Sequence, residues 1–85
     1  MKTMATNNIN LAAQLSAYYQ QEINYTKVAL VNETDIIERG KICWYCLQRC
    51  LGACQYAQML GMRFETAEAL FEGQRAILNE LEIGA

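Results

Sequence analysis

The sequence predicts an all-α fold: one domain of three helices, with a long central helix and a helical hairpin leading to a C-terminal amphipathic helix. Two observations support this fold. Apolar residues recur at the three- and four-residue spacing of helices, and a glycine near residue 61 interrupts the pattern once. In addition, 53% of the 85 residues are hydrophobic, and so short a chain has little interior in which to bury them. We therefore expect the bundle to dimerise.

The first helix is expected to begin near Asn8, after a flexible polar tail over residues 1–7; residues 8–85 then form a single helical domain. Its apolar stripe includes Leu11, Leu15 and Tyr18 and, unexpectedly, Glu22. A position at the helix edge or an ion pair across an interface would explain that carboxylate. Whether residues 25–31 stay helical is open, because this segment is rich in β-branched residues.

The central helix is expected to run from about residue 33 to residue 60. Asn32 can cap it, and Glu33 and Asp35 place negative charge in the first turn, which the helix dipole favours. At about 1.5 Å per residue such a helix is about 40 Å long. A compact monomer would leave part of this helix uncovered, so its length also favours a dimer.

Gly61 is expected to end the central helix in a left-handed conformation, with Met62 making the accompanying apolar contact. A last helix then begins near Phe64 or Glu65. It has one apolar face and one face of Glu and Arg, and Gly84 follows as a stop signal.

All four cysteines lie between residues 43 and 54, and on a helical wheel they fall on the apolar side of the central helix. Neighbouring cysteines on a helix are too far apart for an undistorted disulfide, and Cys43 and Cys54 are too far apart to bind one zinc ion. We therefore interpret the stripe as a dimer or helix-packing seam of small residues. This cysteine stripe consists of Gly40, Cys43, Leu47, Cys50, Cys54, Ala57 and Gly61. A metal site shared between the thiolates of two chains is an alternative.

Composition argues against several functional classes. The net charge is −2, which disfavours nucleic-acid binding, and the chain has no histidine, the commonest general base and metal ligand. Because no nucleophile–base pair or phosphate-binding loop is visible, we expect no enzyme, cofactor or metal. Residues 1–10 have no signal-peptide pattern and the uncharged residues 3–21 are too polar to span a membrane, so a cytoplasmic protein is expected.

Residues 56–75 resemble a repressor-type helix-turn-helix motif. Its small, turn and buried apolar positions are occupied by Ala57, Leu60, Gly61, Met62, Thr66, Ala67 and Leu70. The supposed recognition helix, however, carries Glu65, Glu68 and Glu72, which would repel a phosphate backbone. Because the resemblance and the acidic charge point in opposite directions, a nucleic-acid-binding regulator that uses residues 56–75 is kept as an alternative hypothesis.

The function that the sequence favours is protein binding. Tyr45 projects from the polar side of the central helix, and exposed aromatic side chains are common anchors of interfaces. Glu65, Glu68 and Glu72 would add an acidic surface. We expect a small adaptor, inhibitor or regulatory subunit that binds an unidentified protein through these four residues and forms a homodimer.

Overall fold

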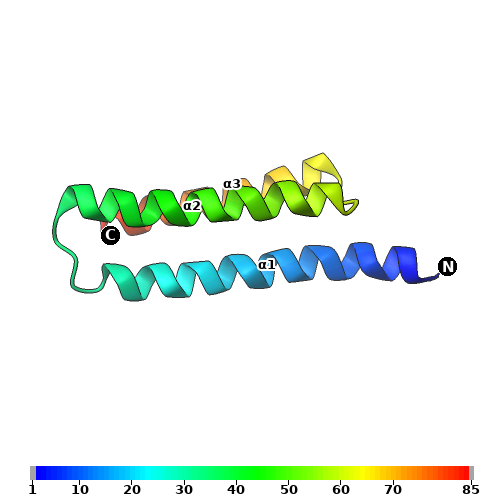
Figure 1. Ribbon diagram of the computed structural model, residues 1–85, viewed down its shortest axis with the longest axis horizontal. Helices are drawn as coiled ribbons and strands as arrows, with labels where there is room; N and C mark the ends of the chain where they lie inside the picture. Colours follow the sequence, from blue (N-terminus) through cyan, green and yellow to red (C-terminus); the bar gives the residue numbers. More distant parts are fainter. Residues whose placement is uncertain (1, 85) are drawn as a thin grey trace.

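A computed structural model describes the backbone of residues 2–84 and the side chains of residues 10–84. The chain forms three helices, α1 (Lys2–Leu30), α2 (Ile36–Met59) and α3 (Phe64–Ile83), and residues 2–84 contain no strand. The helices lie side by side in an elongated bundle of 52 × 19 × 17 Å, in which each helix runs opposite to the preceding one (Figure 1). The predicted all-α, three-helix fold is therefore confirmed.

Helix α1 is the longest element, with 29 residues against 24 in α2. It continues to Leu30 and ends in a turn at Val31 and Asn32, so most of the uncertain segment 25–31 is helical. The backbone of residues 2–7, expected as a tail, forms the first turns of α1. The flexibility of that tail stays a prediction, and residue 1 lies outside the described residues.

Helix α2 begins at Ile36, later than expected, and its cap is Asp35 rather than Asn32. The backbone at Asp35 is extended, and its side chain accepts a hydrogen bond of 3.0 Å from the Ile37 amide. Asn32 cannot take this role because it still belongs to the turn that closes α1, where the Glu33 amide donates to the Leu30 carbonyl.

The end of α2 follows the glycine pattern that the sequence indicates. Gly61 has a positive φ of 116°, which side-chain-bearing residues rarely adopt. The Met62 amide donates to the Ala57 carbonyl and the Gly61 amide to the Gln58 carbonyl, the two bonds of a Schellman motif. Met62 and Ala57 then share the core, so the turn brings α3 back against α2.

The hydrophobic core runs between the three helices, and α2 packs against both of the others. Small side chains dominate the contribution of α2, whereas α1 supplies larger ones. The buried cluster consists of Leu15, Tyr19, Ile23, Cys46, Cys50, Cys54, Ala57, Met62, Ala67 and Leu78. Because α2 offers mostly sulfur and methyl groups, its neighbours can approach closely.

Arg39 fastens one end of the bundle. Its Nη1 donates to the carbonyl oxygens of Leu30 and Glu33, at 3.2 and 2.7 Å. Its Nη2 and Nε donate to the carbonyl oxygens of Leu81 and Glu82, at 2.7 and 3.1 Å. One guanidinium therefore satisfies carbonyl groups at the C-terminal ends of two helices, where a positive charge is favourable.

No helix within residues 2–84 is both long enough and apolar enough to cross a lipid bilayer.

Candidate interaction site

The four cysteines are free thiols, and all are buried. Cys46 and Cys50 have no exposed surface at all. The Cys46 Sγ donates to the Glu22 carbonyl of α1 at 3.8 Å, and the Cys54 Sγ donates to the Ala67 carbonyl of α3 at 3.6 Å. These thiols therefore act as small apolar groups with a weak donor between helices of their own chain.

The cysteine stripe is divided by the tertiary structure. Cys50, Cys54 and Ala57 belong to the core between the three helices. Gly40, Cys43 and Leu47 line a groove between α2 and α3, and Gly61 lies exposed in the turn. The residues that we expected to form one seam thus lie in three environments: the core, the groove and the turn. The ones in the core face helices of the same molecule.

A buried polar link joins all three helices at the centre of the bundle. The Gln74 Nε2 of α3 donates to the Tyr19 carbonyl of α1 at 3.0 Å and to the Cys50 Sγ of α2 at 3.3 Å. The Tyr19 hydroxyl in turn donates to the Cys50 carbonyl at 3.2 Å. Each helix therefore contributes to one network, which sets the register of the bundle.

Burial makes these central groups hard to ionise. Burial raises the pKa of the Cys50 thiol to about 12, against a hydrogen bond from Gln74 that lowers it. Burial also raises the pKa of Tyr19 well above its usual range. A nucleophilic cysteine needs a lowered thiol pKa, so Cys50 has the environment of a structural residue.

Metal ligands do not gather among the described side chains. No three cysteine, aspartate or glutamate residues between positions 10 and 84 are placed to hold one metal ion. A site shared between two chains would have to reach thiols that already face α1 and α3, and reaching Cys46 or Cys50 would require the bundle to open.

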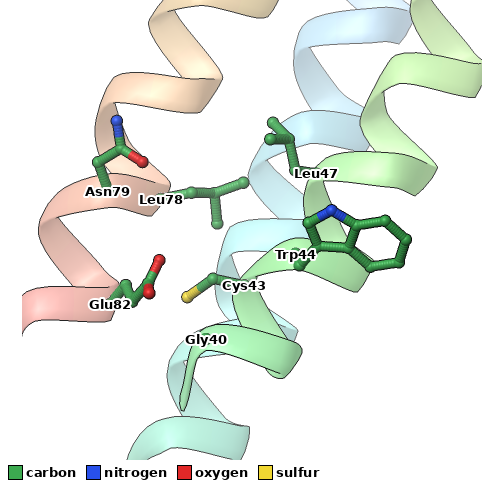
Figure 2. Close-up of a pocket in the computed structure, with 7 residues that line it drawn as sticks. All are labelled: Gly40, Cys43, Trp44, Leu47, Leu78, Asn79 and Glu82. Carbon is green, nitrogen blue, oxygen red and sulfur yellow. The ribbon is translucent and has the colours of Figure 1, made fainter. Parts of the chain in front are cut away.

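The groove between α2 and α3 is shown in Figure 2. Gly40 leaves space on α2, and the Glu82 carboxylate of α3 lies over it, with Oε2 3.3 Å from the point that a Cβ on Gly40 would occupy. The groove is lined by Gly40, Cys43, Trp44, Leu47, Leu78, Asn79 and Glu82. A neighbouring hollow lined by Ile36, Asn79, Glu82 and Ile83 extends the groove toward the end of the bundle.

A second surface lies on the outside of α1 and α2, around an ion pair that sequence reasoning had only anticipated. The Arg49 Nη2 and Nε lie 2.8 and 2.9 Å from the Glu22 Oε1, and this hydrogen bond raises the pKa of Arg49. Glu22, the unexpected carboxylate of the apolar stripe, is therefore buried by pairing with a cation of the next helix.

Tyrosines surround this ion pair. Tyr18 and Tyr25 lie one helical turn on either side of Glu22, and burial raises the pKa of the Tyr18 hydroxyl. Tyr45 lies one turn before Arg49, and Tyr56 lies two turns after it. The tyrosine face consists of Tyr18, Glu22, Tyr25, Tyr45, Arg49 and Tyr56; Tyr25, Tyr45 and Tyr56 are 60, 56 and 60% exposed. Figure 1 shows that α1 and α2 run side by side here.

The acidic candidates lie elsewhere. Glu65, Glu68 and Glu72 are exposed on the side of α3 away from the buried Ala67 and Gln74. Glu65 lies 3.8 Å from Arg63, and Glu72 lies 3.0 Å from Arg75. The structure thus separates these glutamates from Tyr45, which lies on the α1 side of α2.

The geometry of residues 56–75 differs from a helix-turn-helix pair, whose helices cross at about 90–120°. Contacts between Cys54 and Ala67, Cys50 and Gln74, and Gly40 and Glu82 follow one another along the bundle. Helix α3 therefore lies back along α2 as an antiparallel hairpin (Figure 1).

No family model matches this chain, and no match was found among curated proteins or among solved structures. We therefore infer the function from the residues of this chain. As site residues, sequence reasoning selected Tyr45 but not the other tyrosines of the tyrosine face, nor the groove side chains Trp44, Asn79 and Glu82. The helical spacing of Tyr45, Arg49 and Tyr56 was a signal for the former. No signal existed for the groove, because it depends on the register between α2 and α3.

Proposed function

We propose that this chain is a small, non-enzymatic protein-interaction module, such as an adaptor, an inhibitor or a regulatory subunit, which binds a protein target through its helical surfaces. The observation that carries the proposal is the tyrosine face. Tyrosine offers a large, rigid, amphipathic contact at a low cost in conformational entropy, and it is enriched where proteins meet. Three tyrosines on this face expose more than half of their surface around an ion pair that holds α1 and α2 in place.

The acidic residues of α3 form the second part of the proposal. Glu65, Glu68 and Glu72 would meet a basic region of the target, and such a contact mainly accelerates association and weakens with salt. Because Glu65 and Glu72 already have exposed cationic neighbours, we assign the larger share of the affinity to the tyrosines.

The proposal also includes self-association and location. Thirteen large apolar side chains are substantially exposed among the described residues, and a second copy would cover part of them. In this homodimeric bundle α2 would be the long central helix, and the dimer would act in the cytoplasm.

The test compares target capture by matched variants. Tagged protein is incubated with an extract of its native host, and the captured proteins are quantified by mass spectrometry. Replacing Tyr45 and Tyr25 together by alanine should reduce capture of the specific target at least tenfold, because interface aromatics often contribute 2 kcal/mol or more, which corresponds to at least about tenfold.

The control is Ile77→Ala, which removes a partly exposed apolar side chain from α3, outside the tyrosine face. It should capture the target as well as the unmodified chain does. Equal capture by the tyrosine variant and the unmodified chain would show that this face does not bind the target.

A further inference from the structure

We propose that two copies of the chain pair antiparallel along their α2–α3 sides, with Arg63 of each copy seated against Glu82 in the groove of the other. The inference rests on the homodimer proposed above and specifies how its two copies meet. It assigns the groove an occupant that the chain itself supplies.

Glu82 is the group in the groove that lacks a partner. Among residues 10–84, its carboxylate has neither an ion pair nor a hydrogen bond, although it lies in contact range of Gly40. The neighbouring Arg39 directs its N–H groups at backbone carbonyl oxygens, including that of Glu82 itself. The groove therefore presents a negative charge above a floor of Cys43, Leu47 and Leu78.

The surroundings of the groove are apolar. Ile36 and Ile83 are each 80% exposed beside it, and Trp44 stands half-exposed at its rim. Burial, followed by the charge of Glu82, raises the pKa of Cys43, while the charge of Arg39 lowers it. Such a groove fits a cation that is flanked by apolar side chains.

The turn between α2 and α3, at the opposite end of the bundle, carries a cation of this kind, Arg63. The side chain of Arg63 is 83% exposed, and its contact with Glu65 spans 3.8 Å between two exposed groups, so little holds it in place. Its neighbours Met59, Leu60 and Phe64 are exposed apolar residues. The two ends of the α2–α3 hairpin are therefore complementary both in charge and in apolar surface.

The register of the hairpin allows both contacts at once. The Cys50–Gln74 bond places residues 51–52 of α2 level with residues 72–73 of α3. Counted along the chain, Arg63 lies as many residues after residues 51–52 as Gly40 lies before them. It also lies as many residues before residues 72–73 as Glu82 lies after them. A two-fold axis perpendicular to the bundle at this level therefore brings Arg63 of each copy level with Gly40 and Glu82 of the other.

Other arrangements of the same contact are less favourable. Arg63 cannot reach Glu82 of its own chain, because Arg63 caps the start of the 20-residue helix α3 and Glu82 lies in its last turn. A head-to-tail contact would leave a groove unused at one end of a growing filament and an arginine unused at the other. The antiparallel pair satisfies both sites of both copies and closes.

Sedimentation of charge-reversed variants tests the pairing. The unmodified chain should sediment as a dimer. Glu82→Arg and Arg63→Glu should each weaken the dimer at least tenfold, since each reversal places two like-charged contacts in the interface. The double variant, which exchanges the two charges, should regain most of the lost affinity. Glu80→Arg is the matched control, because residue 80 is exposed on another side of α3; it should leave the dimer unchanged.

Circular dichroism of each variant shows whether α3 still folds, and Glu82→Gln and Arg63→Gln repeat the test with smaller changes. A dimer that survives both reversals, or a double variant that stays as weak as the single ones, would overturn the pairing but leave the homodimer. A monomeric unmodified chain would overturn both. Tyr45 lies on another face of the bundle. Target capture by the tyrosine variant is therefore a separate test of the proposed function.

Discussion

The two halves of the cysteine stripe have similar residues but different neighbours. Cys50, Cys54 and Ala57 are enclosed by α1 and α3, and the network of Gln74 passes through them. Gly40, Cys43 and Leu47 lie under a groove in which the Glu82 carboxylate is the nearest polar group of α3. Small residues at helical spacing thus permit close packing, while the neighbouring helices determine whether that space is filled or left open.

The largest expected effect comes from placing a charge in the enclosed half. Cys50→Arg should destabilise the fold by about 4 kcal/mol or more, because an unpaired cation would have to be buried where no surface is exposed. A domain of this size is stable by about 4–13 kcal/mol, so most of its helical signal in circular dichroism should be lost.

Gln48→Arg is the control, because residue 48 is exposed one half-turn away on the same helix. This variant should keep its melting temperature. A folded Cys50→Arg protein would mean that this half of the stripe is open to solvent, contrary to its burial here.

Removing the Arg39 side chain, which joins the ends of α1 and α3 beside the groove, should have the next largest effect. Arg39→Ala deletes three hydrogen bonds to carbonyl oxygens at the ends of α1 and α3 and a fourth to the Glu33 carbonyl in the loop after α1, and it should cost about 2 kcal/mol or more in urea unfolding. Hydrogen exchange should accelerate first in the last turns of these two helices. Arg75→Ala, which breaks only the exposed pair with Glu72, should cost no more than about 1 kcal/mol. Equal losses of unfolding free energy in the two variants would contradict the role of Arg39 in holding the helix ends.

Alkaline pH should weaken the enclosed half. Burial raises the pKa of Cys50 from 9.0 to about 12, so between these values the unfolded chain releases a proton that the folded chain retains. The contribution of Cys50 to the free energy of unfolding is therefore complete below pH 9 and falls as pH rises toward 12. Urea midpoints of Cys50→Ala should fall less over this range than those of the unmodified chain, and an identical fall would exclude Cys50 as a contributor.

The smallest effects concern two glycines. Gly73→Ala should stabilise the protein by up to about 1 kcal/mol, since a Cβ there meets nothing within 4 Å and alanine favours the helix. Gly40→Ala should gain less, because its Cβ would lie 3.3 Å from Glu82 Oε2 and would displace that carboxylate. Thermal melts of both variants decide this, and an equal gain at Gly40 would mean that Glu82 does not rest over it.

Some features could be predicted from the sequence because they depend on contacts within a few residues. The three helices, the Gly61 turn and the stop at Gly84 follow from spacing and backbone preference. The start of α2 could not be placed as well, because Asn32 and Asp35 both suit a helix cap. The choice depended on where α1 ends and on Arg39 holding the connecting loop.

The helical character of this chain and the apolar side of each helix follow from its amino-acid sequence, since a period of 3.6 residues fixes both. What meets each side depends on how the three helices pack. This packing pairs Glu22 with Arg49, links Tyr19, Cys50 and Gln74, and places the Glu82 carboxylate over Gly40 without a partner among residues 10–84. The physical reason is that register and rotation between helices arise from packing among distant residues, and a one-turn shift of α3 would replace every one of its contacts without changing the pattern of the sequence.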